Sequence, residues 1–157
     1  LLLIHWPNPS VPIPETIGAM NRLQEDGTVK HIGVSNFSVA QMQEASEASD
    51  TPILTNQVEY NPFVSQDAVH TACVERDMFL TAYTPIAKNR VSRDQTMQSI
   101  AEKYGKSPAQ VTLRWHIQQD HVITIPKSSK RNHLEENFDV FDFELEKDEM
   151  QRISAIS

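Results

Sequence analysis

Short apolar runs alternate with stretches of helical spacing along the whole chain. The apolar runs have the length and residue types of strands in a covered sheet, and they occupy residues 1–4, 31–37, 52–62, 78–85 and 121–129. Amphipathic stretches predict helices at residues 14–27, 39–49, 65–77, 95–105, 107–119, 130–141 and 144–157. This alternation is typical of right-handed βαβ units, so it predicts an α/β fold with a parallel sheet.

Local stop and start signals agree with these boundaries. The first helix is expected to begin near Pro14 and to end at Gly27, and Ser38 is expected to cap the second helix. Gly105 and Pro108 divide the long helical stretch at residues 95–119 into two helices. No linker of low complexity interrupts the pattern, which favours a single domain.

The first apolar run, residues 1–4, is followed by two prolines that stop the ladder of hydrogen bonds, Pro7 and Pro9. His5 is therefore predicted at the C-terminal end of a strand. A strand as apolar as this one needs neighbours on both sides, so we expect it to be covered, and we expect part of the domain to lie upstream of residue 1.

Each predicted strand ends in polar residues: His5, Ser35 with Asn36, Gln57, Tyr83, and Lys127 with Ser128. In a (β/α)8 barrel the functional side chains gather at these strand ends and converge on one mouth. A complete barrel has eight strands and typically about 250 residues. The pattern therefore predicts a partial (β/α)8 TIM barrel, with about the last five strands present in this chain.

Composition narrows the classes of function. A hydrophobic content of 39% over 157 residues is sufficient for a core, and the net charge of −7, with both signs mixed, argues against nucleic acid as a partner. No apolar run approaches the roughly 18 residues of a membrane span. The single cysteine, Cys73, excludes an intrachain disulfide and favours a reducing, cytoplasmic location.

Metal binding receives no support from the remaining histidines. Their spacing to one another and to acidic residues differs from the spacing that metal ligands show. These histidines are His31, His70, His116 and His121. We therefore predict no metal site.

Five ordered motifs together resemble the aldo-keto reductase family: "IHWP", "GVSNF", "NQVEYNP", "AYTPI" and "IPKSSKRNHLEENFDVFDFEL". The likeness is greatest to the branch of diketogluconate reductase and aldose reductase. It implies that residues 1–157 are the C-terminal part of one barrel domain, beginning at its fourth strand. It also implies that the protein reduces aldehydes and ketones by hydride transfer from NADPH, and that it is a monomer or weak dimer. Members of the family bind NADPH without a Rossmann fold, and this chain accordingly has no GxGxxG motif.

The resemblance assigns one catalytic residue to this chain. The family uses an aspartate, a tyrosine, a lysine and a histidine, and only the histidine, His5, has its motif here. His5 would orient the carbonyl of the substrate. The alternative is a purely structural role, as a histidine hydrogen-bonded in a turn. Trp6 matches a tryptophan of the substrate pocket, or is a packing residue. No tyrosine of this chain lies in the motif of the proton donor.

The resemblance also assigns a set of cofactor-binding residues. Ser35, Asn36 and Gln57 would bind the nicotinamide carboxamide, and Tyr83 would stack on the nicotinamide ring. Thr84, Pro85 and Ile86 would follow the pyrophosphate. The adenosine end would contact the residues of the last motif: Lys127, Ser128, Lys130, His133, Glu136 and Asn137. The alternatives are loop caps for Ser35 and Asn36, a core position for Tyr83, and a solvated basic turn at residues 127–131.

Two departures from the family pattern bear on the cofactor. His133 stands where relatives usually have an arginine that clamps the 2′-phosphate, and a neutral imidazole has no bidentate fork, so NADH becomes possible beside NADPH. Relatives also commonly have serine and glycine in place of Thr84 and Ala87.

Two rival hypotheses about function stay open: a catalytically silent nucleotide-binding module and an inactive fragment. If the family's aspartate, tyrosine and lysine lie upstream of residue 1, the enzyme is favoured over both of these alternatives.

Overall fold

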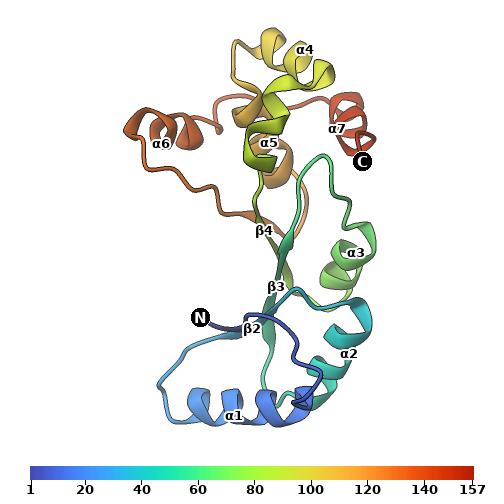
Figure 1. Ribbon diagram of the computed structural model, residues 1–157, viewed down its shortest axis with the longest axis vertical. Helices are drawn as coiled ribbons and strands as arrows, with labels where there is room; N and C mark the ends of the chain where they lie inside the picture. Colours follow the sequence, from blue (N-terminus) through green and yellow to red (C-terminus); the bar gives the residue numbers. More distant parts are fainter. The chain divides into compact units, whose positions relative to one another are not determined.

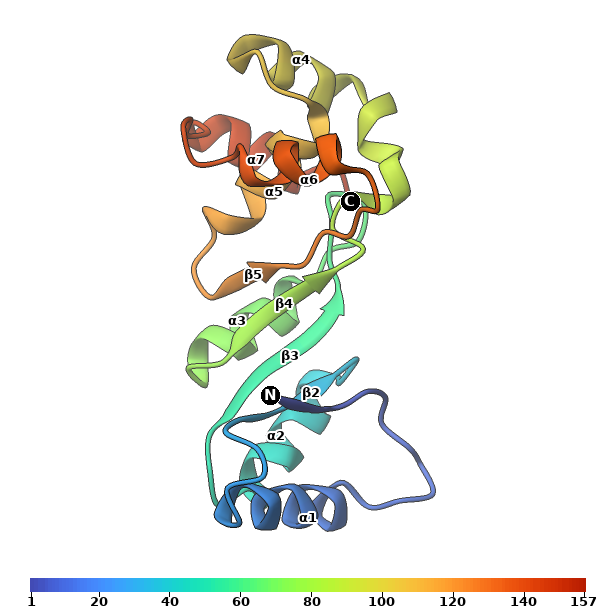
Figure 2. The ribbon, with the colours of Figure 1, turned by 90° about the vertical axis from the view of Figure 1, so that its left-hand side faces the viewer.

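The computed structural model describes all residues from 1 to 157 and contains one five-stranded sheet. Its strands are β1 (Leu2–Ile4), β2 (Ile32–Ser35), β3 (Ile53–Glu59), β4 (Phe79–Tyr83) and β5 (Val122–Thr124). Hydrogen bonds join them in the order β1-β2-β3-β4-β5, and β1–β2 and β2–β3 are parallel pairs (Figure 2). The predicted α/β class is confirmed.

Seven α-helices follow the strands along the chain (Figure 1). They are α1 (Ile13–Glu25), α2 (Val39–Ala48), α3 (Asp67–Glu75), α4 (Gln95–Tyr104), α5 (Pro108–Ile117), α6 (Arg131–Phe138) and α7 (Lys147–Ser154). Each lies within a predicted helical stretch, apart from the first residue of α1. The structure adds a 3₁₀ helix that the pattern did not predict, η1 (Ala87–Arg93).

Side-chain caps fix where several of these helices begin. Ser38 Oγ accepts a hydrogen bond from the Gln41 backbone amide at 3.3 Å, and Gln41 Oε1 accepts one from the Ser38 backbone amide at 2.9 Å, so the predicted cap of α2 is a capping box. Ser107 makes the same arrangement at the start of α5. Gly105 ends α4 with φ of 62°, a left-handed conformation that glycine adopts without steric cost.

The chain forms two compact units. The first unit consists of Leu1–Val58 and Asp67–Thr81, and the second unit consists of Glu59–Gln66 and Ala82–Ser157. In the first unit, α1 and α2 pack side by side, and the fully buried Ile17, Ile32 and Met42 belong to the core. Cys73 on α3 is also buried there, and burial raises its pKa to about 11, so the thiol is inert at neutral pH.

The second unit has its own core around α5. Val91, Leu113 and Ile153 are buried there, together with Trp115, whose indole donates to Ser154 Oγ at 3.1 Å. At its periphery Glu149 of α7 is buried, which opposes ionisation, but hydrogen bonds from Lys103 and Tyr104 outweigh burial and lower its pKa.

None of the helices combines the length and apolar content needed to cross a bilayer.

The first strand differs from its prediction in one respect. Residues Leu2–Ile4 are half-buried and not covered on both sides. β1 is the first strand in the order of the sheet and β2 is its hydrogen-bonded neighbour, so one edge of β1 has no strand beside it in this chain.

Candidate functional site

In the first unit, the ends of β2 and β3 bring three of the predicted cofactor residues together. Parallel pairing places Ser35 opposite Gln57. The Ser35 hydroxyl donates to the Gln57 carbonyl at 2.7 Å and accepts from Asn36 Nδ2 at 3.0 Å. The backbone amide of Asn36 also donates to the Gln57 backbone carbonyl, at 2.9 Å. A short hydrogen-bonded cluster therefore holds the Ser35 hydroxyl and the Asn36 side chain against the Gln57 backbone carbonyl.

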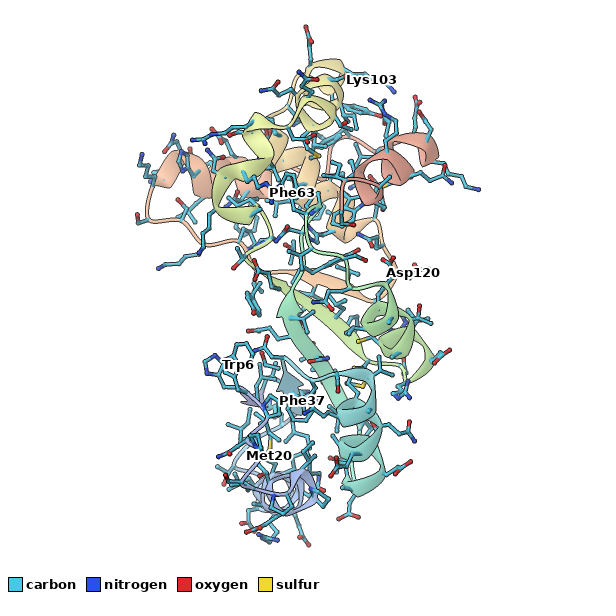
Figure 3. All side chains as sticks on the ribbon, turned by 45° about the vertical axis from the view of Figure 1, so that its right-hand side comes forward. Trp6, Met20, Phe37, Phe63, Lys103 and Asp120 are labelled. Atoms are coloured by element: carbon cyan, nitrogen blue, oxygen red, sulfur yellow. The ribbon has the colours of Figure 1, made fainter.

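The same cluster reaches His5. Asn36 has φ of 61°, a left-handed conformation that asparagine tolerates better than most residues, and its Nδ2 donates to the His5 carbonyl at 3.1 Å. The His5 and Trp6 side chains are exposed, with ring centroids 6.3 Å apart, and Figure 3 shows Trp6 at the surface of this unit. Both rings can be reached by a ligand, whereas the His5 carbonyl is held by Asn36.

In the second unit, Tyr83 ends β4 and is partly buried. Burial raises the pKa of its phenol, and the nearby Glu59 carboxylate raises it further. Tyr83 is therefore a neutral phenol at pH 7, which suits a ring that stacks on a ligand and does not suit a proton donor that works near neutrality.

The chain after Tyr83 adopts left-handed backbone at four positions. Thr84 has φ of 51°, Ala87 47°, Lys88 51° and Asn89 68°. A β-branched threonine and an alanine are costly in this region, because the Cβ crowds the neighbouring backbone. The two unusual residues of this segment, Thr84 and Ala87, thus both lie at strained positions.

Hydrogen bonds and one ring contact hold this segment in the second unit. The Thr84 carbonyl accepts from the Ala87 amide at 3.0 Å and from Asn61 Nδ2 at 3.3 Å. The Arg90 guanidinium lies 3.9 Å from the centroid of the Phe63 ring, which Figure 3 labels. Such a cation–π contact fixes η1 against the loop at residues 59–66.

A pocket of about 290 Å³ in the second unit collects most of the predicted adenosine-binding residues. Its lining includes Lys127, Ser128, His133, Glu136 and Asn137, together with Ile86 from the predicted pyrophosphate segment. Pockets that enclose whole ligands measure about 300–1,000 Å³, so this volume suits one end of a dinucleotide.

The basic side chains in and beside this pocket face solvent. Lys127, Lys130 and His133 are exposed, and Ser128 Oγ accepts from the Lys130 amide at 3.1 Å in a local turn before α6. Lys130 is not among the residues that line the pocket, and it is the N-cap residue of α6 without a side-chain capping bond. Exposed cations beside a helix N-terminus favour an anion such as a phosphate.

Sequence reasoning missed other residues that line this pocket. Asn89 and Ser92 come from η1, and Ser107 and Pro108 come from the start of α5. The only signal was the cap motif at Ser107, which indicates a helix start and says nothing about a pocket. The structure contains no cluster of three histidine, cysteine or acidic side chains that could hold a metal.

Comparison with known proteins places this architecture in a family. The chain matches the Aldo/keto reductase family over residues 1–157, and it belongs to that family. Five strands in an α/β arrangement agree with the (β/α)8 barrel of its members. The resemblance drawn from the five motifs is therefore confirmed.

Individual relatives include enzymes that reduce small carbonyl compounds. Glyoxal reductase of Bacillus subtilis (strain 168) is 38% identical over 157 residues, covering 100% of this chain and 56% of the relative. Methylglyoxal reductase DkgA of Escherichia coli (strain K12) is 36% identical over 160 residues, covering 99% of this chain and 58% of the relative. The chain thus spans little more than half the length of these curated relatives.

Solved structures give the same result. The crystal structure of a putative 2,5-diketo-D-gluconic acid reductase B is 44% identical with a TM-score of 0.97, and the match covers 99% of this chain and 55% of that one. A point mutant of Gox0644, crystallised in complex with NADPH, is 38% identical with a TM-score of 0.91, covering 98% of this chain and 57% of that one. The chain therefore shares its family and its fold with these solved reductases.

Proposed function

We propose that the protein containing this chain reduces small aldehydes and ketones to alcohols with NADPH, with NADH as a second possible cofactor. The observation that carries this proposal is the second-unit pocket, because its lining joins Lys127, Ser128, His133, Glu136 and Asn137 in one place. Relatives that reduce glyoxal and methylglyoxal, and a structural relative with bound NADPH, support the same reaction class.

The residues present fit the two ends of such a cofactor. Asparagine and glutamine side chains offer both a donor and an acceptor, as a carboxamide requires. In the first unit, the Asn36 side-chain amide belongs to the hydrogen-bonded cluster that includes the Gln57 backbone carbonyl. In the second unit, Lys127 and Lys130 offer positive charge for a 2′-phosphate, and the half-exposed Tyr83 offers an aromatic face.

In this proposal each residue has one task. The bound cofactor supplies the hydride. His5 orients the substrate carbonyl through a ring N–H, and Trp6 forms a wall of the substrate site. Ser35, Asn36 and Gln57 hold the carboxamide, Tyr83 supports the ring, and Thr84, Pro85 and Ile86 follow the pyrophosphate. Lys127, Ser128, Lys130, His133, Glu136 and Asn137 hold the adenosine end.

The finer expectations belong to this proposal as well. We propose that residues 1–157 form the later part of a single barrel domain and that the aspartate, tyrosine and lysine of the catalytic set lie upstream. We also propose a cytoplasmic protein that is a monomer or weak dimer. The NADPH preference rests on Lys127 and Lys130, and His133 weakens it because it lacks the arginine fork.

Turnover in the intact protein tests this proposal. NADPH consumption is measured with glyoxal, methylglyoxal and glyceraldehyde, and calorimetry measures NADPH binding in parallel. We expect turnover with at least one substrate, and His5→Asn should lower kcat about 100-fold while the Kd for NADPH changes less than about threefold. The exposed His31 serves as control, since His31→Asn should change neither value. Tight NADPH binding without turnover on any carbonyl would support the silent nucleotide-binding module instead.

A further inference from the structure

His116 on α5 is a fully buried histidine for which the proposed function has no task. Its ring contacts two aromatic neighbours, with centroid distances of 4.8 Å to Trp115 and 5.4 Å to Tyr60. Burial lowers the pKa of its imidazole to about 4. The ring is therefore neutral at pH 7 and carries one N–H, on one of its two nitrogens.

Each ring nitrogen faces a backbone carbonyl. Nδ1 lies 2.8 Å from the Thr112 carbonyl oxygen, and Nε2 lies 3.1 Å from the Tyr60 carbonyl oxygen. Thr112 lies one turn earlier in α5, so its carbonyl is already the helical acceptor for the amide of residue 116. Tyr60 follows β3, 56 residues before His116. A proton on Nε2 would thus tie α5 to another segment, whereas one on Nδ1 would only add a bond within the helix.

The segment at Tyr60 leads directly to the predicted cofactor residues of the second unit. The Tyr60 amide donates to the Tyr83 carbonyl at 3.4 Å, and Asn61 Nδ2 donates to the Thr84 carbonyl at 3.3 Å. The Tyr60 hydroxyl adds a second anchor just after the end of α5, because it donates to Gln119 Oε1 at 2.7 Å. Tyr60 and Asn61 are both buried, so this connection is shielded from water.

Thr84 needs such support. Its φ of 51° places a β-branched residue in left-handed backbone, which persists only where surrounding contacts determine it. If the Tyr60–Asn61 segment moved, the carbonyls of Tyr83 and Thr84 would lose the partners that hold them. The orientation of the Tyr83 ring would then be less well defined.

We propose that His116 is a positioning residue for the cofactor site, whose Nε2–H donates to the Tyr60 carbonyl and thereby fixes the backbone of Tyr83 and Thr84. This inference rests on the proposed function, in which Tyr83 and Thr84 contact the cofactor. His116 itself touches no substrate or cofactor, and it acts through the Tyr60–Asn61 segment.

Two amide substitutions separate this role from simple packing. The amide nitrogen of glutamine has the reach of Nε2, and that of asparagine has the reach of Nδ1. In the intact protein, calorimetry is used to measure NADPH binding to His116→Gln, His116→Asn and His116→Leu, well below the unfolding temperature of each. We expect the Kd of His116→Gln to stay within about threefold of the original, and the Kd of the other two to rise about tenfold.

A control for loss of stability comes from α7 of the second unit. Glu149→Gln weakens the contact of α7 with Lys103 and lies outside the cofactor site, so it should lower stability without changing the Kd. Equal Kd values for His116→Gln and His116→Asn would overturn the proposal, and so would a rise in Kd for Glu149→Gln as large as that for His116→Leu. If the unsubstituted protein binds neither NADPH nor NADH, the proposed function itself fails.

A measurement on the unsubstituted protein avoids the risk that a variant fails to fold. Nitrogen-15 NMR of the imidazole distinguishes the two neutral tautomers. We expect the His116 proton on Nε2 at pH 7, with the spectrum unchanged by added salt. A proton on Nδ1 would overturn the proposal, because no ring N–H would then be available to the Tyr60 carbonyl.

Discussion

The two units hold their candidate site residues in different ways. In the first unit, Ser35 and Asn36 are tied to neighbouring carbonyls, and Asn36 also fixes the backbone of His5. In the second unit, Lys127 and His133 stand exposed around a pocket. One region has its polar groups held by hydrogen bonds, and the other has basic side chains exposed to solvent. The first arrangement suits orientation of a reacting group, and the second suits recognition of a charged one.

The largest expected effect concerns the second unit alone and follows from His116. Its pKa is lowered to about 4 in the folded state from an ordinary value near 6.5. The unfolded chain therefore binds more protons between these values, and the stabilisation present above pH 6.5 is lost as the pH falls toward 4. The loss amounts to about 3 kcal/mol.

Urea unfolding of the intact protein at several pH values, followed by circular dichroism, measures this loss. His116→Gln has no group that titrates there, so its stability should fall by about 3 kcal/mol less over the same interval. Parallel curves for the two proteins would contradict the assignment.

The next effect separates two glycines of the first unit. A Cβ at Gly33 would lie 2.6 Å from Leu3 Cδ2 and 3.0 Å from the Thr55 carbonyl oxygen, so Gly33→Ala should destabilise the fold by about 2 kcal/mol. Gly18 on α1 has only Arg22 Nη1 within 4 Å, at 3.8 Å, so Gly18→Ala should stabilise by about 0.5–1 kcal/mol. Thermal unfolding with calorimetric detection checks both, and a stabilising Gly33→Ala would show that β1 and β3 yield more easily than their packing suggests.

The affinities of two variants for NADPH and NADH test whether the two site regions bind different ends of the cofactor. Lys127→Met should weaken NADPH binding about tenfold and leave NADH binding nearly unchanged, because only NADPH has the 2′-phosphate. Asn36→Gly keeps the left-handed backbone and removes the amide, so it should weaken both cofactors by the same factor, about fivefold. Calorimetric titrations of the intact protein with each cofactor measure these ratios. A selective effect of Asn36→Gly would place it near the phosphate instead.

The smallest effect concerns the strained segment after Tyr83. Ala87 has φ of 47°, so Ala87→Gly should raise stability by about 0.5–1 kcal/mol. Ala101 in the middle of α4 is the matched control, because Ala101→Gly should lower stability by about 1 kcal/mol or more. Urea midpoints of the two variants decide the matter, and a destabilising Ala87→Gly would mean that the methyl group packs usefully at η1.

Periodicity and caps predicted most of the elements, because these signals are local. The cap at Ser38 and the end of α4 at Gly105 appear in the structure as expected. The left-handed backbone at Thr84 and Ala87 could not be predicted, since both residue types disfavour it and only tertiary contacts hold it. The apolar run indicated that β1 needs a neighbour on each side, but it did not show that only one of them, β2, belongs to this chain.

The candidate site shows the same division. The polar strand ends could be read from the sequence, and the motifs indicated which of them share a task. The pocket also takes Asn89 and Ser92 from η1, a segment without any recognisable pattern. His116 was considered only as a possible metal ligand, because its partner Tyr60 is far away in the sequence.

The two tryptophans of the chain have opposite surroundings. Trp6 in the first unit is 58% exposed, and Trp115 in the second unit is 2% exposed. Trp6 should fluoresce at longer wavelength and be quenched by iodide, whereas Trp115 should fluoresce at shorter wavelength and be protected. Each unit therefore contains its own optical reporter, and a ligand that covers Trp6 would change one emission and leave the other in place.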